Sequence, residues 1–291
     1  MSEAAANGWE LSLIDSAWHG SPYEGPRGLA MAAELGYEAI DLFVGFDPAA
    51  LSREERDQYL GTVRTGALPA LGIICTCLGL SDFNPSVRDY HIRRACAVID
   101  LGAELDSVRN LLFVPGDYIF QGKLLPREQE WDRVVDATRQ VGTHAALRGL
   151  EVAIELLPFE HAFVRTLDDL ERLLDAVGLP NVKAGIDISH LWLERIEPEA
   201  LSRFAGRVGQ VHIADCDGEN HGDLPAGRGN TPFLDYLSVL GTTGYRGAAS
   251  VELEFPANPA EIVEWVAEAH DNTRRLLAES GLRPDLRAGV A

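Results

Sequence analysis

Basic residues are scarce in this 291-residue chain, which has 25 Lys and Arg against 45 Asp and Glu and a formal net charge of −20. Proteins that bind nucleic acid neutralise its phosphates with clustered Lys and Arg. The sequence therefore excludes nucleic acid as an expected partner, and its excess of acidic side chains favours solubility instead.

Long apolar runs are also missing. No stretch reaches eighteen consecutive apolar residues, and the first ten residues contain neither the basic segment nor the apolar core of an export signal. We therefore expect a cytoplasmic protein without a membrane partner.

Cysteine is rare, and the four present follow neither a disulfide framework nor a zinc-finger spacing. Cys75 and Cys77 are two residues apart, so in a strand they share one face. Because free cysteine is among the most buried residue types, we expect both to be buried thiols.

Nucleotide-binding loops are not found either. No GxGxxG follows the first apolar run, and GxxxxGK[ST] does not occur. The stretch PAGRGN (225–230) is rich in glycine but has no lysine, so it is a weak nucleotide signature.

What the chain does contain is an alternation of short apolar runs with longer amphipathic ones, which is typical of βα units and a parallel sheet. Eight strands are predicted, at 11–18, 37–45, 72–80, 110–117, 152–158, 182–192, 208–216 and 248–255. Amphipathic stretches between them include 52–68, 86–105 and 127–149, and a last helix is predicted at about 259–280. Ser52 and Glu55 have the spacing of a capping box.

Eight βα pairs in this length predict an α/β fold, a single (β/α)8 barrel domain over 1–291 with short flexible ends at about 1–8 and 282–291. An open doubly wound sheet remains the alternative.

Four of the predicted strands carry a polar residue near their carboxyl ends, where the active sites of such barrels form. These residues are Glu155, Asp187, His212 and Glu252. A charged group among apolar neighbours is costly unless it is paired or binds a metal. Three carboxylates and one imidazole suit Mn²⁺, Mg²⁺ or Co²⁺, and Zn²⁺ less well.

A divalent ion at these residues would bind two adjacent oxygens of a hydroxy-ketone or hydroxy-aldehyde and favour an enediolate. Glu155 and Glu252 would flank such a sugar, so that one removes a proton and the other returns one.

The C-terminal half resembles the xylose isomerase-like barrels of the sugar phosphate isomerase/epimerase superfamily. The matching segments are IELLP, GIDISH, QVHIAD, HGDLPAGRG and GYRGAASVELE, and they cover about half of the chain. The resemblance implies one divalent ion, Mn²⁺ before Mg²⁺, Co²⁺ or Zn²⁺, held by Glu155, Asp187, His212 and Glu252. It also implies that Glu155 and Glu252 are the catalytic acid/base pair of an epimerase acting on a keto-sugar. Glu252 is chosen over Glu254 because the family has its Glu five residues after the Gly of a GYxG turn.

Five residues are candidates for contacts with a carbohydrate substrate. His190 completes the DxxH motif that begins at Asp187, although a loop histidine that caps a helix would look the same. The epimerases place an Arg soon after the metal-binding His, whereas this chain has acidic residues there. The further candidates are His221, Arg228, Glu160 and Trp18.

Several other functions share this pattern. A DNA-repair endonuclease of the superfamily also has DxxH, but it needs further histidines from the early strands, and the runs 72–80 and 110–117 contain none. A two-metal aldose isomerase would use Asp215, Asp217 and Asp223 for a second ion, whereas a solvated acidic loop is the simpler interpretation of these residues.

The strongest alternative is a metal-dependent lyase or dehydratase, which removes the same proton and then eliminates a group at the β-carbon. The barrels of this kind act on 3-keto-sugars, keto-inositols or 3-oxo-C-glycosides, and the last group works with a small partner subunit. A homo-oligomer is the other expected assembly. A non-catalytic barrel subunit is the alternative from a different class, since fold alone does not establish activity.

Overall fold

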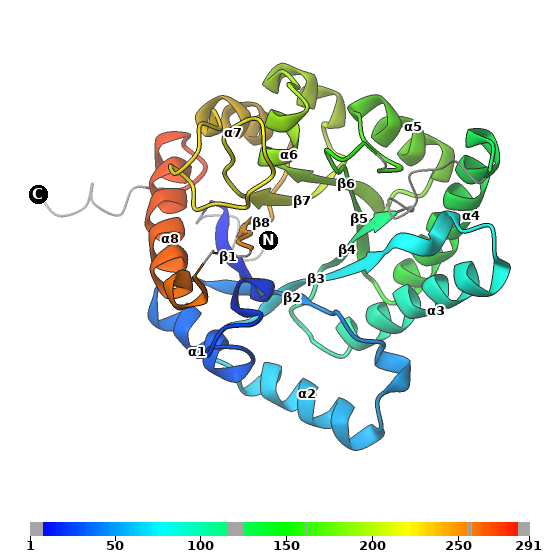
Figure 1. The fold of residues 1–291 in the computed structure, drawn as a ribbon, viewed down its shortest axis with the longest axis horizontal. Helices are drawn as coiled ribbons and strands as arrows, with labels where there is room; N and C mark the ends of the chain where they lie inside the picture. Colours follow the sequence, from blue (N-terminus) through cyan, green and yellow to red (C-terminus); the bar gives the residue numbers. More distant parts are fainter. Residues whose placement is uncertain (1–7, 116–124, 161, 255, 257, 285–291) are drawn as a thin grey trace, which may run out of the picture. The chain divides into compact units, whose positions relative to one another are not determined.

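A computed structural model describes residues 8–115, 125–160, 162–254, 256 and 258–284. Strands and helices alternate through these residues (Figure 1), as the periodicity predicts. The eight strands are Glu10–Ile14 (β1), Ala39–Phe43 (β2), Ala70–Cys77 (β3), Asn110–Pro115 (β4), Glu151–Glu155 (β5), Val182–Asp187 (β6), Val208–Ile213 (β7) and Ala248–Val251 (β8). They follow one another in this order in a closed barrel. The barrel interpretation is confirmed, and the open doubly wound sheet is wrong.

The helices alternate with these strands. The α-helices are Pro26–Glu34 (α1), Arg53–Thr65 (α2), Pro85–Gly102 (α3), Arg127–Leu147 (α4), Leu167–Val177 (α5), Ile188–Leu193 (α6), Phe233–Thr242 (α7) and Ile262–Glu279 (α8). Short 3-10 helices are Asp15–Trp18 (η2), Pro48–Ala50 (η3), Leu78–Ser81 (η4), Pro198–Phe204 (η5) and Pro259–Glu261 (η6). Within the part of the chain that the structure describes, no helix combines the length and the apolar composition that crossing a bilayer requires.

The chain divides into two compact units. The first contains residues 1–41, 66–68 and 186–291, and the second contains 42–65 and 69–185. In the first unit β7, β8, β1 and β2 pair in parallel, with His212 opposite Ser250 and Ser12 opposite Ala39. In the second unit β3, β4, β5 and β6 pair in parallel. The predicted single domain and flexible ends stay predictions.

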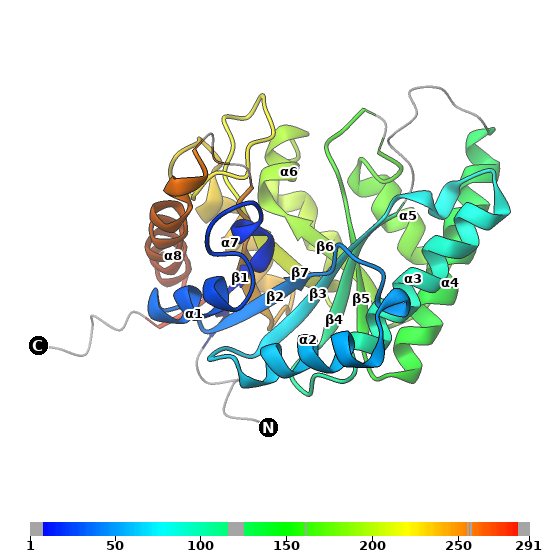
Figure 2. The ribbon, with the colours of Figure 1, turned by 60° about the horizontal axis from the view of Figure 1, so that its bottom comes forward.

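In the second unit, α3 and α4 lie beside one another next to β3, β4 and β5, as both ribbon views show (Figures 1 and 2). At the start of α2, Ser52 Oγ accepts a hydrogen bond from the Glu55 N–H, and Glu55 Oε2 accepts one from the Ser52 N–H, so the capping box is confirmed. Cys75 and Cys77 are buried free thiols with 3.5 Å between their sulfur atoms, also as predicted.

In the first unit, α8 packs on β1 and β8. The segment just after this helix is held beside the starts of β1 and β2, because the Trp9 N–H donates to the Leu282 carbonyl and Arg283 pairs with Glu38 at 2.5 Å. Strand β1 ends at Ile14, four residues before the predicted boundary. Residues 15–18 form η2 instead, and its buried apolar residues resemble a strand in sequence.

Candidate metal centre

Three of the predicted ligands meet in the first unit, at the carboxyl ends of its strands. Asp187 is the last residue of β6, His212 lies in β7, and Glu252 directly follows β8. One ligand atom of each lies within 4.8 Å of the others. His212 Nδ1 is 2.8 Å from Glu252 Oε2. These side chains therefore converge as a metal site requires.

Strand register explains why Glu252 lies beside His212. His212 is opposite Ser250 in the parallel pair of β7 and β8, and the Glu252 N–H donates to the Ile213 carbonyl at 3.1 Å. Glu254 follows two residues later, and its N–H donates to the carbonyl of Asp223 on a neighbouring loop. Alternation alone could not separate the two glutamates, whereas the pairing with His212 favours Glu252.

Asp187 serves as a helix cap as well as a candidate ligand. Its Oδ1 accepts hydrogen bonds from the His190 N–H at 3.0 Å and from Ser189 Oγ at 2.7 Å, so it is the N-cap of α6. Burial raises the pKa of the Asp187 carboxyl, but the imidazoles of His190 and His212 and these two hydrogen bonds outweigh it, and the pKa lies below its usual range. Asp187 is therefore a carboxylate at neutral pH.

The other oxygen of this carboxylate indicates what the site can hold. Asp187 Oδ2 is buried and accepts no hydrogen bond from any described residue. A buried carboxylate oxygen without a donor is costly unless a cation lies beside it. With the His212 imidazole and the Glu252 carboxylate next to it, the three side chains fit a divalent ion.

Glu155 is the last residue of β5 and belongs to the second unit. Its side chain is buried, and in the register of β5 and β6 it lies opposite Gly185. It thus occupies the predicted position at a strand end. Its membership in one site with the other three stays a prediction.

Two of the predicted substrate contacts also lie in the first unit. His190 is on α6 and is buried, whereas His221 is on the loop after β7 and its side chain is 29% exposed. Their Nε2 atoms are 3.0 Å apart. Asp223 lies beside them, with Oδ1 3.4 Å from His221 Nε2. The two predicted contacts are thus neighbours, and Asp223 is a buried partner that the sequence did not identify as part of their cluster.

Asp215 holds the glycine-rich loop that follows β7. Its Oδ1 accepts the N–H groups of Cys216 at 2.8 Å and Thr231 at 3.2 Å, and its Oδ2 accepts those of Gly227 at 2.7 Å and Gly229 at 2.9 Å. A Cβ at Gly229 would collide with the Cys216 carbonyl oxygen. The glycines therefore wrap a carboxylate of the protein itself, through the kind of backbone contact that elsewhere binds phosphate.

The interpretation of Asp215, Asp217 and Asp223 as a solvated acidic loop is wrong for two of these three residues. Asp215 and Asp223 are buried, and only Asp217 is exposed. Asp217 accepts hydrogen bonds from the N–H groups of Glu219 and Asn220. Asp215 and Asp217 are thus committed to loop structure, so the predicted set of three aspartates does not form one ion site.

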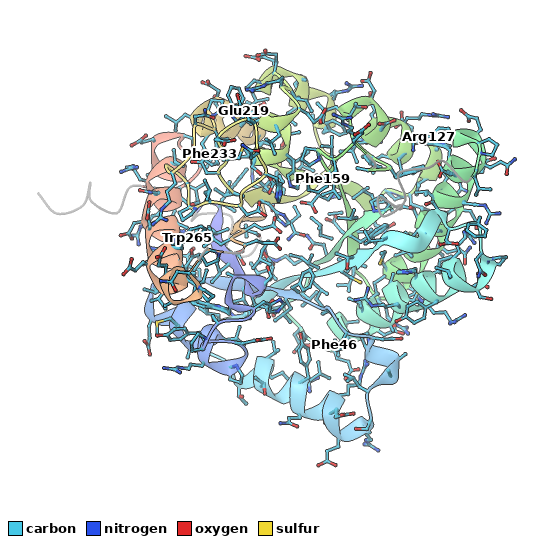
Figure 3. All side chains as sticks on the ribbon, viewed as in Figure 1. Phe46, Arg127, Phe159, Glu219, Phe233 and Trp265 are labelled. Atoms are coloured by element: carbon cyan, nitrogen blue, oxygen red, sulfur yellow. The ribbon has the colours of Figure 1, made fainter. Side chains whose placement is uncertain are left out.

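The remaining predicted contacts lie in other surroundings. Arg228 pairs with Glu268 at 2.6 Å and stacks over Trp265 of α8, which Figure 3 labels. Trp18 is buried in η2, with its ring centroid 5.9 Å from that of Tyr23. Glu160 is exposed in a turn of the second unit. Nothing in these positions tests their roles toward a substrate.

A family model described as "Xylose isomerase-like TIM barrel" matches residues 29–276 of the chain. D-psicose 3-epimerase of Ruminiclostridium cellulolyticum is 28% identical over 140 residues, which are 47% of this chain and 45% of the epimerase. Inosose dehydratase 2 of Bacillus cereus is 26% identical over 198 residues, which cover 60% of this chain and 64% of the dehydratase. The chain thus spans about half to two thirds of the length of these curated relatives.

Solved structures agree on the fold. An L-ribulose 3-epimerase superposes with a TM-score of 0.77 at 18% identity, covering 94% of this chain and 96% of that chain. The IOLI protein, whose structure holds a zinc atom, superposes with a TM-score of 0.77 at 17% identity over 93% of this chain and 99% of that chain. At 17–18% identity, these superpositions show that the chain shares the barrel fold.

Proposed function

Since the chain belongs to the xylose isomerase-like TIM barrel family, we propose that it is a divalent-metal-dependent sugar isomerase or epimerase that acts on a keto-sugar or a sugar derivative by proton transfer. The observation that carries this proposal is the convergence of Asp187, His212 and Glu252 at the carboxyl ends of successive strands. Active sites of this fold lie at that end of the strands.

The ion would be held by Asp187, His212 and Glu252, with Glu155 as the proposed fourth ligand. Support for Glu155 is its place as the buried last residue of β5, at the carboxyl end of the strand, where active sites of this fold lie. Mn²⁺ is the proposed ion because three carboxylates and one imidazole form an oxygen-rich set. When bound, the ion supplies positive charge that polarises a sugar carbonyl and eases removal of the neighbouring proton.

The two glutamates are proposed to move that proton. One carboxylate takes it from the carbon beside the carbonyl, and the other delivers a proton to the opposite face of the same carbon. This change inverts one centre and leaves the mass of the sugar unaltered. His190 and His221 are proposed as the polar contacts that hold substrate hydroxyls, with Arg228, Glu160 and Trp18 as further candidates.

A lyase is the second candidate, favoured by the match to an inosose dehydratase over a longer part of this chain than the match to the epimerase. The same proton leaves the carbon beside the carbonyl, a carbon–carbon double bond forms, and the carbon–oxygen bond at the β-carbon breaks. The departing oxygen takes up a proton and leaves as water. We also propose a cytoplasmic location and a homo-oligomeric assembly. In the case of C-glycoside cleavage, a small second subunit is proposed instead.

Incubation of keto-sugars and keto-inositols with the Mn²⁺-loaded protein in deuterated water tests both candidates. An epimerase gives an isomer that carries one solvent deuterium, whereas a dehydratase gives a product lighter by one water. Neither product, together with a protein that binds no divalent ion, would instead support a non-catalytic barrel.

The variant Glu252→Gln tests the assignment of the base, and Glu254→Gln is its matched control. We expect Glu252→Gln to lower kcat by about 10²–10⁴-fold, the usual contribution of general acid–base catalysis. Glu254→Gln should stay within a few-fold of the unaltered protein. A large loss in Glu254→Gln with activity retained in Glu252→Gln would show that the assignment is wrong.

A further inference from the structure

Two thiols of the second unit face one another near the carboxyl end of β3. Cys75 and Cys77 lie on the same face of this strand with their Sγ atoms 3.5 Å apart, and we call them the dithiol pair. Both are free thiols whose side chains are fully buried. Because buried thiols commonly serve as small apolar groups, a chemical role for the pair must be argued from its surroundings.

A buried cation lies beside the dithiol pair. Arg94 is on α3, which packs against β3, and its side chain is buried. Its guanidinium donates hydrogen bonds to three backbone carbonyl oxygens, those of Thr76 at 2.6 Å, Val44 at 2.8 Å and Phe46 at 3.3 Å. These acceptors are neutral, so they satisfy the N–H groups without cancelling the positive charge. Positive charge near a thiol favours its thiolate form.

The two sulfur atoms of the pair differ in their readiness to ionise. The hydrogen bond from the Cys77 thiol lowers the pKa of Cys75, and together with the charge of Arg94 it outweighs the effect of burial. The same hydrogen bond, with burial, raises the pKa of Cys77. The pair thus combines one thiol that ionises readily with a neighbour that keeps its proton, which is the arrangement of an attacking and a resolving cysteine.

The other two cysteines have different surroundings. Burial and the neighbouring carboxylate of Asp100 raise the pKa of Cys96 to about 11. Cys216 belongs to the first unit, where its sulfur lies 3.8 Å from both the Ser189 carbonyl oxygen and Thr231 Oγ1. Neither residue combines a lowered pKa with a facing sulfur atom, so both serve as internal controls for the pair.

The backbone allows the two sulfur atoms of the pair to bond. A strand rises about 3.3 Å per residue, so residues two apart have Cα atoms about 6.6 Å apart, within the range that disulfides bridge. The sulfur atoms would move from 3.5 Å to the bonded distance of about 2 Å. Cys77 is the last residue of β3, has a ψ of +53°, and is followed at once by η4. The end of the strand can therefore take up this movement.

Burial decides which oxidants can reach the pair. Both side chains are fully covered, so a reagent as large as glutathione disulfide would contact the sulfur atoms only after this part of β3 opens. Hydrogen peroxide is uncharged and close to water in size, so small fluctuations of the packing are enough to admit it. The pair is therefore shielded from thiol–disulfide exchange but not from a small peroxide.

We propose that Cys75 and Cys77 form a peroxide-sensitive dithiol that closes to a reversible disulfide within β3. The Cys75 thiolate attacks one oxygen of hydrogen peroxide, the O–O bond breaks, and the departing hydroxide takes up a proton to become water. The sulfur of Cys77 then attacks the Cys75 sulfenic acid, so that an S–S bond forms and the S–O bond breaks. The hydroxyl group takes the Cys77 proton and leaves as a second water. Two thiols are thus oxidised and one peroxide is reduced, and no step depends on the proposed function.

Peroxide treatment of the reduced, full-length protein, followed by unfolding in excess alkylating reagent, tests the proposal by peptide mass. We expect Cys96 and Cys216 to carry the label. The peptide 65–88, which cleavage after arginine releases, should be unlabelled and lighter by two hydrogen atoms than its reduced form. Dithiothreitol before alkylation should restore both labels in this peptide. Glutathione disulfide in place of peroxide should leave all four thiols open to labelling.

Single variants test the order of the two steps. In Cys77→Ala the Cys75 sulfenic acid has no partner, so it should be trapped by dimedone, whereas Cys75→Ala should give no adduct at Cys77. Cys96→Ala is the matched control, because it removes another thiol of the same unit and should leave the disulfide unchanged. The mass measurement on the unaltered protein holds even where a variant fails to fold.

Four labelled thiols after peroxide treatment would overturn the proposal. A link that includes Cys96 or Cys216, or oxidation of Cys75 to a sulfinic acid without a link, would overturn it as well. A dimedone adduct at Cys77 and none at Cys75 would contradict the assignment of the attacking thiolate. A disulfide that glutathione disulfide forms as readily as peroxide does would contradict the selectivity attributed to burial.

Discussion

Replacement of Asp215 by Asn tests the claim that a single carboxylate organises the loop after β7. The substitution keeps the size of the side chain but replaces one acceptor oxygen by an NH₂ group. Whichever way the amide turns, two of the four N–H donors that now contact the carboxylate will face a donor instead. The loop must then either leave two buried N–H groups without acceptors or open to water.

The expected loss of stability follows from the number of hydrogen bonds that the substitution removes. A hydrogen bond to a charged group contributes about 1.5–3 kcal/mol. Loss of two such bonds therefore predicts that Asp215→Asn lowers the free energy of unfolding by about 3–6 kcal/mol, with local opening of the loop setting the lower end. The exposed Asp217 in the same loop provides the control, because Asp217→Asn should change stability by less than about 0.5 kcal/mol.

Urea unfolding measures the global effect, and amide hydrogen exchange at Gly227 and Gly229 measures the local one. We expect both amides to lose protection in Asp215→Asn. A loss of stability below about 1 kcal/mol, together with unchanged exchange at the two glycines, would refute the view that Asp215 holds this loop.

Two other predictions concern the metal and pH. Saturation with Mn²⁺ at a hundredfold excess over Kd should stabilise the protein by about 2.7 kcal/mol, which corresponds to about 4–5 °C in Tm for a chain of this length. A chelator should reverse the shift, and an unchanged Tm in calorimetry would contradict the metal site. Burial raises the pKa of Glu38, but hydrogen bonds from Arg283 and the Leu11 N–H outweigh it and lower the pKa below its ordinary value. The stabilisation from Glu38 is therefore present at pH values above that ordinary pKa and is lost as the pH falls. In urea unfolding, Glu38→Gln should lower the free energy of unfolding by about 0.5–1 kcal/mol at pH 7 and by little near pH 3. An equal cost at both pH values would contradict this assignment.

The strands could be predicted from sequence because those of a parallel barrel are buried on both faces and appear as short apolar runs. Their ends were less predictable. The run that begins at Val182 continues through Trp192, yet the strand ends at Asp187 and Ile188 begins α6. A short buried helix and a strand cannot be distinguished by hydrophobicity alone. The polar residue Asp187 marks the end of the strand better than the end of the apolar run does.

The residues of the candidate site, too, could be predicted only in part. His212 and Glu252 could be predicted because each is a polar residue at the end of an apolar run. The burial of Asp215 and Asp223 could not be predicted from the sequence. Backbone N–H groups satisfy the carboxylate of Asp215, and the position of Asp223 depends on the backbone pairing of Leu224 with Asp215. Sequence patterns carry no direct sign of such backbone partners.

The N-cap at Asp187 gives a geometric origin to the spacing of the DxxH motif. An N-cap side chain reaches the N–H group of the third helical residue, and that residue is His190. One oxygen of Asp187 thus fixes the start of α6, while the other lies buried without a hydrogen-bond donor among the described residues. The distance between the two motif residues is therefore set by helix geometry rather than by the ligand. Transfer of the motif to another barrel would have to include the strand-to-helix junction along with the Asp and the His.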